Sequence, residues 1–282
     1  MEFQIRARLY SRGRLVYERT DAPAFGVAEA QAEALNKRPF VYEERFPVEP
    51  GDYRLDVTAL NKASGRSYEA SQSFSVAPTG PGIFTSDLLL AGQRESDARP
   101  RPFQFGGTRY APLTAGQTLS SRPLQVFYQV KRSGETAEWT AEYVIGSVAG
   151  KFRKTIEGRL DFTQSDSTGV VSAAQSLPID DLAPGAYQLA LRLRNPKTGQ
   201  VTGRSAGFVV VNQEEEQPIL VARPVVAGPQ GAAAAHYERA LCWLAQERPA
   251  EALREAEASG RLMQTPAARQ LLEQLRARGV LQ

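Results

Sequence analysis

The sequence predicts a mainly β protein with two tandem antiparallel β-sandwiches and a small C-terminal α-helical segment. Three observations lead to this fold class. Short stretches of alternating apolar and polar residues, typical of strands, continue up to Val211. One segment of the chain occurs twice at a fixed spacing, which indicates two copies of one kind of domain. The C-terminal residues instead repeat their apolar positions with the period of a helix.

The duplicated segment reads EPGDYRLDVTALNKASGR in the first copy and APGAYQLALRLRNPKTGQ in the second, without a gap. Six residue pairs are identical at the same spacing of 134 positions, as from Tyr53 to Tyr187. The pairs are Pro50 and Pro184, Gly51 and Gly185, Tyr53 and Tyr187, Leu55 and Leu189, Asn61 and Asn195, Gly65 and Gly199. Each copy therefore predicts a corner at Pro-Gly, a strand that begins near the tyrosine, and an Asn-to-Gly hairpin turn.

The first domain is expected at residues 1–78. Its strands are predicted by alternation at residues 3–11, 15–20, 39–48, 53–60 and 67–76, with an alanine-rich loop or short helix at 22–38. This copy begins directly with its first alternating segment, whereas the second copy has a further candidate strand ahead of its hairpin. We therefore expect the first domain to lack its opening strand and to leave an unpaired edge at residues 3–10.

The second domain is expected at residues 79–212, after a stretch rich in Gly, Pro, Ser and Thr. Its clearest feature is a hairpin over residues 123–146, and further strands are predicted at 83–92, 102–113, 151–164, 169–179, 185–194 and 200–211. Residues 213–282 are expected to form an acidic linker and a helical hairpin. Three helices fit this segment, at about 232–246, 249–258 and 266–278, with Pro249 and Pro266 near two helix starts.

The Pro-Gly-x-Tyr segment resembles the tyrosine corner of immunoglobulin-like and fibronectin type III sandwiches, in which the tyrosine hydroxyl bonds to upstream backbone. This resemblance implies that Tyr53 and Tyr187 are structural. Trp139 fits the buried tryptophan on a middle strand of such a sandwich, and an exposed role in stacking on a sugar is its alternative.

Residues 40–211, with FPVEPGDYRLDV, SDLLLAG and PLQVFYQV, resemble the C-terminal β-sandwich region of large bacterial proteins. Those proteins carry a von Willebrand factor A-type or a GWxTD domain further upstream. The resemblance implies the sandwich fold and an extracytoplasmic setting, and no GWxTD motif occurs in this chain. The segment ALCWLAQERPAEALREAEAS resembles a tetratricopeptide hairpin. A single such unit cannot bury its own apolar face, so we expect it to pack on the sandwich, on a second subunit through self-association of the tail, or on repeats that are absent here.

Composition argues against several function classes. The net charge is only +3 and the basic residues are scattered, so nucleic-acid binding is not predicted. No apolar run reaches the length of a membrane-spanning helix, so no membrane insertion is predicted. The single histidine, His236, and the single cysteine, Cys242, lie on a predicted helix away from any nucleophile motif. Carboxylate pairs such as Asp180 with Asp181 lie near turns and read as solvated. No catalytic, cofactor-binding or metal-binding residue and no cofactor is assigned.

We therefore expect a non-catalytic structural or protein-interaction module: a tandem sandwich spacer with a helical protein-binding tail. Its partner would be another protein or upstream domains of the same polypeptide. The alternative is a carbohydrate-binding domain that uses exposed aromatic residues, with Trp139, Tyr128 and Tyr110 as candidates. The setting is periplasmic or at the cell surface if the chain belongs to a longer secreted protein, and cytoplasmic if Met1 is the natural start.

Overall fold

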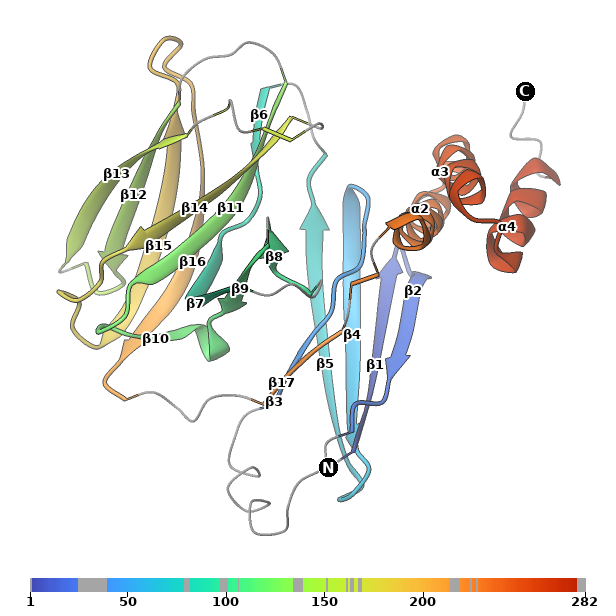
Figure 1. The fold of residues 1–282 in the computed structure, drawn as a ribbon, viewed down its shortest axis with the longest axis horizontal. Helices are drawn as coiled ribbons and strands as arrows, with labels where there is room; N and C mark the ends of the chain where they lie inside the picture. Colours follow the sequence, from blue (N-terminus) through green and yellow to red (C-terminus); the bar gives the residue numbers. More distant parts are fainter. Residues whose placement is uncertain are drawn as a thin grey trace. The chain divides into compact units, whose positions relative to one another are not determined.

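A computed structural model of the protein describes residues 2–24, 40–78, 82–96, 101–105, 107–133, 139–150, 152–160, 162, 165–166, 169–213, 219–223, 225–226 and 228–277. Antiparallel sheets make up most of it, and three α-helices follow near the C-terminus (Figure 1). The predicted class, mainly β with antiparallel sheets and a small C-terminal helical segment, is therefore confirmed. The chain divides into two compact units, one of Met1–Pro78 with Leu220–Gln282 and one of Thr79–Ile219. The helical segment thus belongs to the same unit as the first β-domain.

The first unit is built on one antiparallel sheet of four strands in the order β2-β1-β4-β5. The strands are β1 (Phe3–Ser11), β2 (Arg14–Asp21), β4 (Gly51–Asn61) and β5 (Arg66–Val76). A separate two-stranded sheet pairs β3 (Phe40–Glu43) with β17 (Ile219–Ala222). The helices are α2 (Gly228–Ala245), α3 (Pro249–Leu262) and α4 (Pro266–Ala277), so Pro249 and Pro266 begin helices as predicted.

The second unit is a sandwich of two sheets. One has five strands in the order β10-β16-β15-β12-β13, and the other has the order β14-β11-β7-β9-β8 with β6 also paired to β11. The strands are β6 (Gly82–Thr85), β7 (Leu89–Ser96), β8 (Gln104–Phe105), β9 (Thr108–Pro112), β10 (Gln117–Leu119), β11 (Leu124–Ser133), β12 (Trp139–Ser147), β13 (Arg153–Leu160), β14 (Val170–Leu177), β15 (Gly185–Arg194) and β16 (Val201–Val211), with a 3-10 turn η1 (Thr114–Gly116). Alternate residues of both sheets, such as Val126 and Ile145, meet in one buried core.

The two tyrosine corners have the same geometry. The Tyr53 hydroxyl donates to the carbonyl of Glu49 at 2.6 Å, and the Tyr187 hydroxyl donates to that of Ala183 at 2.7 Å. Each tyrosine ring also stacks on a phenylalanine of the next strand, with a centroid distance of 5.6 Å in both copies. The bond back to upstream backbone is the one that the corner motif predicts, so both tyrosines are structural.

The two hairpin turns after the corners also match. The side-chain oxygen of Asn61 accepts hydrogen bonds from the amides two and three residues further on, and Asn195 does the same. Gly65 and Gly199 close the turns with φ of 68° and 73°, in the left-handed region that glycine adopts without strain. The duplication is therefore one of backbone conformation as well as of sequence.

Strand pairing extends the correspondence to the whole first sheet. Ser11 of β1 lies opposite Tyr53, and Ser147 of β12 lies opposite Tyr187. The order β2-β1-β4-β5 therefore corresponds strand by strand to β13-β12-β15-β16 in the second unit. The second unit packs this sheet against another sheet of strands. In the described part of the first unit, α2 packs against the corresponding sheet instead, and the unit also contains the small β3–β17 sheet.

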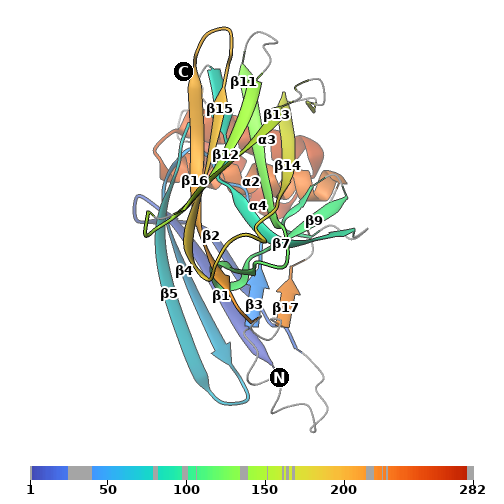
Figure 2. The same cartoon turned by 90° about the vertical axis from the view of Figure 1, so that its left-hand side faces the viewer.

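The expected unpaired edge at residues 3–10 is not present. β1 is a central strand that pairs with β2 on one side and with β4 on the other. Pairing on both sides counts against the expectation that the opening strand beside β1 is lacking. The strands at the two ends of this sheet are β2 and β5, and Figures 1 and 2 show β5 beside β4.

Candidate functional site

Helix α2 packs its small residues on the apolar face of the first sheet. Cys242 and Ala245 are buried against Leu9, Val16 and Tyr53. Small side chains let a helix axis come close to a sheet, and Cys242 behaves here as a small apolar residue. Burial raises the pKa of the Cys242 thiol, which keeps it protonated and unreactive. The single cysteine therefore serves packing.

The C-terminal end of α2 is fixed to the first tyrosine corner by Gln246. Its side-chain amide donates to the Tyr53 hydroxyl at 3.1 Å, while the guanidinium of Arg12 donates to its backbone carbonyl at 3.1 Å. Arg12 stands in the two-residue turn between β1 and β2, where φ is 48°. Its charge lies beside the helix C-terminus, where carbonyls lack intrahelical partners and a cation is stabilising.

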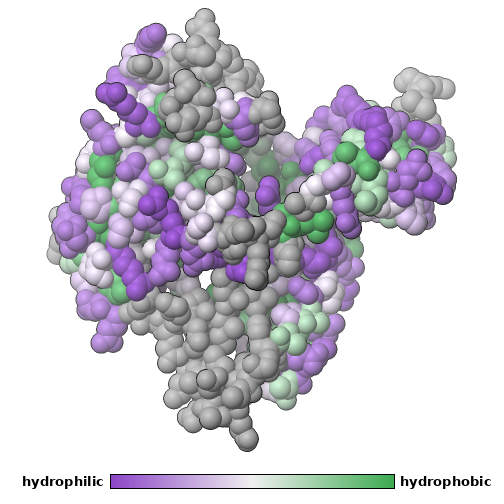
Figure 3. Space-filling view, in the orientation of Figure 1, coloured by the Kyte–Doolittle hydropathy of each residue, from purple (hydrophilic) through white to green (hydrophobic). Residues whose placement is uncertain are grey.

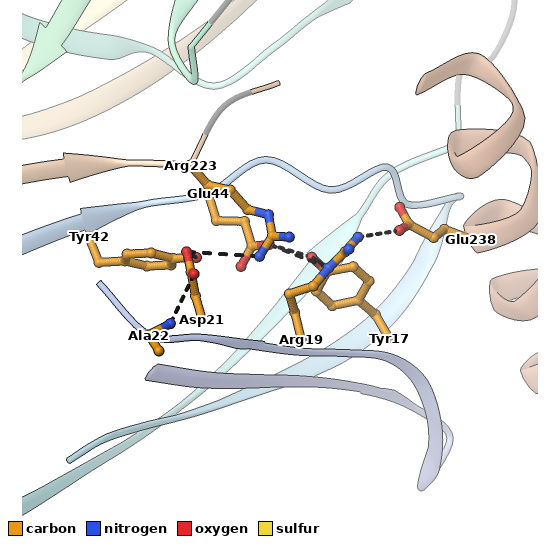
Figure 4. Close-up of polar contacts among 8 residues, drawn as sticks. All are labelled: Tyr17, Arg19, Asp21, Ala22, Tyr42, Glu44, Arg223 and Glu238. Carbon is orange, nitrogen blue, oxygen red and sulfur yellow. Dashed lines mark hydrogen bonds and ion pairs between the residues drawn. The ribbon is translucent and has the colours of Figure 1, made fainter. Parts of the chain in front are cut away.

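A polar network along β2 connects the same helix to β3 and β17 (Figure 4). Arg19 donates to Glu238 of α2 at 3.0 Å and to the hydroxyl of Tyr17 at 3.1 Å. Tyr17 in turn donates to the carboxylate of Glu44 at 2.5 Å, and Arg223 lies 3.7 Å from that carboxylate. The network joins four segments that are distant in the sequence.

Burial governs the protonation of this network. The Glu44 side chain is only 7% exposed and lies between two guanidinium groups. Burial raises the pKa of Glu238 above its ordinary value, and burial also raises the pKa of Tyr42 to about 12. Each acidic side chain here has a basic or hydroxyl partner. We therefore infer that the network holds α2 and the neighbouring segments together and does not act as an acid–base pair.

His236 also has a structural position. Its Nδ1 lies 2.7 Å from the carboxylate of Glu255 on α3. Arg239 bonds to the same carboxylate at 3.0 Å and lies 3.2 Å from Glu49, beside the corner. These contacts tie α2 to α3 and to the sheet. Among the described residues, no group of three metal-ligating side chains converges on a point.

Strand β5 forms one of the two edges of the first sheet. It pairs with β4 in an unbroken register over its eleven residues, and no described strand pairs with its other side. Its side chains are exposed except for half-buried Phe74 and Val76, and Tyr68 is 60% exposed. The strand contains no proline, lysine or bulge, which are the usual features that prevent further pairing.

The corresponding edge in the second unit is partly occupied. There, β10 pairs in parallel with the last residues of β16, Val209–Val211.

A shallow concavity of about 440 Å³ lies near the corner end of β5 in the first unit. Its lining residues come from β1, its turn, β4 and β5: Tyr10, Arg12, Gly13, Asp52, Tyr53, Arg54, Ser73, Phe74 and Ser75.

The aromatic residues of the carbohydrate alternative are buried. Trp139 is 4% exposed, Tyr128 is 1% exposed and Tyr110 is 7% exposed. The hydroxyl of Tyr128 bonds to that of Tyr143 inside the sandwich at 2.9 Å. These rings cannot form a sugar-stacking platform, so that part of the alternative is wrong. The physical reason is that alternation turns Trp139 and Tyr128 into the sandwich core, whereas Tyr110 is buried in a separate cluster with Ala91 and Phe127.

Asp181 pairs with Lys154 at 2.8 Å on the surface, and the hydrogen bond from Lys154 lowers the pKa of its carboxyl. It is a solvated ion pair, as its place near a turn predicted.

Sequence reasoning missed the residues that dock α2, above all Arg12, Arg19 and Gln246. No sequence motif identifies these residues, because each contacts a partner that is 193 to 234 positions away in the sequence.

No helix in the described residues is long and apolar enough to span a membrane. On the side that Figure 3 presents, the helical part of the first unit is mostly hydrophilic with small apolar areas. Comparison with models of known protein families and with curated proteins finds no match to this chain.

Proposed function

We propose that the protein is a non-catalytic interaction module that binds another polypeptide at the open edge of its first sheet. One observation carries this proposal: no described strand pairs with the outer side of β5 and most of its side chains are exposed, whereas β10 covers part of the equivalent edge of β16. An extended polypeptide can add to such an edge through main-chain hydrogen bonds. The second unit would then serve as the structural arm of the module.

We also propose that both units are related to immunoglobulin-like domains and that the helices are related to tetratricopeptide repeats. The tyrosine corners and the matching strand order support an immunoglobulin-like relationship of both units. The α2–α3 pair, which buries Ala240, Ala252 and Ala256, supports a tetratricopeptide-like relationship of the helices. A bacterial, extracytoplasmic origin and kinship with von Willebrand factor A-type or GWxTD proteins rest on the sequence resemblance alone.

The test is affinity capture with the full chain as bait, from extracts of cells that produce it naturally. Ser71→Lys places a lysine in the middle of β5, and the matched control Ser205→Lys changes the equivalent serine, 134 positions later, in β16. We expect wild type and the control to retain a polypeptide that Ser71→Lys retains at least about tenfold less. Equal retention by all three baits, or retention of nothing by any bait, would contradict the proposal.

A further inference from the structure

The edge of β5 is a position at which this fold accepts another strand. In the second unit, Gln117–Leu119 of β10 add to the equivalent strand β16 at its corner end. The first unit has the same corner and the same strand pairing, yet β5 is the last strand of its sheet in the described residues. A strand can therefore be added to β5 without a change in the architecture of the sheet.

The sequence of β5 is complementary to itself in antiparallel pairing. If Ser71 lies opposite Ser71 of a second copy, Tyr68 lies opposite Phe74, and Glu69 lies opposite Ser73. Arg66 then lies opposite Val76, so no two like charges face each other. The remaining side chains of the strand are small or neutral, and none of them blocks a close approach.

At its far edge, the equivalent sheet of the second unit differs from β5 in its charged residues. Its outer strand β13 carries Arg153, Lys154 and Arg159, and positive charges on an edge strand oppose pairing with an identical strand. In β5 the only charged side chains are Arg66 and Glu69, both toward one end. The middle of β5 is thus free of charge along the part where pairing would begin.

Pairing would also cover surface that the first unit leaves exposed. Tyr68 is 60% exposed and points to the same side of the sheet as half-buried Phe74. Across a two-fold axis each Tyr68 would pack on the partner's Phe74, an aromatic cross-strand pair that occurs twice. Two identical strands related by a two-fold axis run antiparallel, which continues the antiparallel sheet of four strands into its copy.

We propose that the polypeptide bound at the open edge is a second copy of this chain, and that the two β5 strands pair antiparallel about Ser71. This inference rests on the proposed function and names its partner. A foreign strand parallel to β5, placed as β10 is on β16, would contact only three residues at one end. Self-pairing uses the full strand.

The first experiment is sedimentation velocity of the purified full chain over a range of concentrations. A single pair of strands buries less than the ~1,200 Å² of standard interfaces, so we expect a reversible, concentration-dependent dimer. Ser71→Lys would bring two ammonium groups together at the two-fold axis and should weaken dimerisation at least about tenfold. The control Ser205→Lys should dimerise like wild type. Circular dichroism melting curves check that both variants are folded.

The second experiment fixes the register. In Ser71→Cys the two introduced thiols would lie directly opposite each other, at a Cα separation of about 4.5–5.5 Å that a disulfide can span. Mild oxidation should give a covalent dimer from Ser71→Cys and not from Ser205→Cys, while the native Cys242 stays buried.

Three results would overturn the inference: a chain that stays monomeric at all concentrations, a dimer that Ser71→Lys leaves intact, or no covalent dimer from Ser71→Cys. If the chain is monomeric but still captures a different polypeptide in a manner sensitive to Ser71→Lys, the partner is foreign. The inference then fails while the proposed function stands. If neither dimer nor captured polypeptide is found, both fail.

Discussion

The corner tyrosines of the two units make the same backbone bond but have different neighbours. Tyr187 stacks on Phe208 and meets the ring of Phe152 edge to face, within a sandwich of two sheets. Tyr53 accepts a hydrogen bond from Gln246 at the end of α2 and packs in a cluster with Cys242. The same corner thus contributes to a sheet-on-sheet core in one unit and to a sheet-on-helix core in the other.

The comparison shows that the features that form the strands are independent of the layer that covers the sheet. The corner, the asparagine turn and the alternation fix the strand pairing locally, and they are duplicated. The covering layer has only to supply apolar surface of the right shape, so a helix with small residues can replace a sheet. The two units differ further in that β5 is the last strand of its sheet in the described residues, and the following predictions test each part of this comparison.

The largest effect is expected for Ala245→Arg, which places a long charged side chain between α2 and the sheet. Ala245 is 5% exposed, so a buried unpaired charge should destabilise the first unit by more than about 3 kcal/mol. Calorimetry should show a lower melting temperature for the first unit and an unchanged melting temperature for the second. Ala234→Arg, on an exposed position of the same helix, is the control and should have little effect. Equal effects of the two variants would show that α2 is not docked.

The next effect compares Tyr53→Phe with Tyr187→Phe. Both hydroxyls donate to a backbone carbonyl, but only that of Tyr53 also satisfies the buried amide of Gln246. We expect a loss of about 1 kcal/mol for Tyr187→Phe and about 2–3 kcal/mol for Tyr53→Phe in the free energy of unfolding of the affected unit. Denaturant titration measures both losses, and equal losses would argue against the Gln246 contact.

A smaller effect compares Gly51→Ala with Gly185→Ala. The two glycines have nearly the same φ, 155° and 159°, so the backbone cost is shared. A Cβ on Gly51 would lie 2.6 Å from the Gln246 amide nitrogen, whereas the nearest atom at Gly185 is 3.8 Å away. Because the amide must then leave Tyr53, we expect Gly51→Ala to cost about 1 kcal/mol more in the same titration. A larger cost at Gly185 would contradict this ranking.

The smallest effect is a pH dependence from Glu238. Its pKa is raised by burial, so the folded state holds a proton above the ordinary value of 4.5. The stability of the first unit should therefore fall as the pH rises from that value through the raised pKa. Glu238→Gln keeps an acceptor for Arg19 and should flatten this slope, although the raised pKa of Glu49 contributes in the same direction. Melting temperatures at several pH values measure it, and an unchanged slope would exclude Glu238 as its source.

Much of the fold could be predicted from the sequence because its signals are local. The proline, glycine, tyrosine and asparagine of the repeat act within a few residues, and Pro249 and Pro266 mark helix starts in the same way. The docking of α2 on the first sheet could not be predicted. Gln246 meets Tyr53 across 193 positions of sequence, and a glutamine carries no pattern that names its partner. The open edge of β5 could not be predicted either, because alternation does not show that no described strand pairs with its outer side.

The central claim is that α2 is the second layer of the first unit and not an independent tail. Native-state hydrogen exchange of the full chain tests it most directly, because amides in one cooperative unit exchange with similar free energies. We predict that the amides of α2 are protected to the same degree as those of β1 and β4, and that Ala245→Arg lowers the protection of all three together. Fast exchange of α2 beside an unaffected, protected sheet would contradict the account.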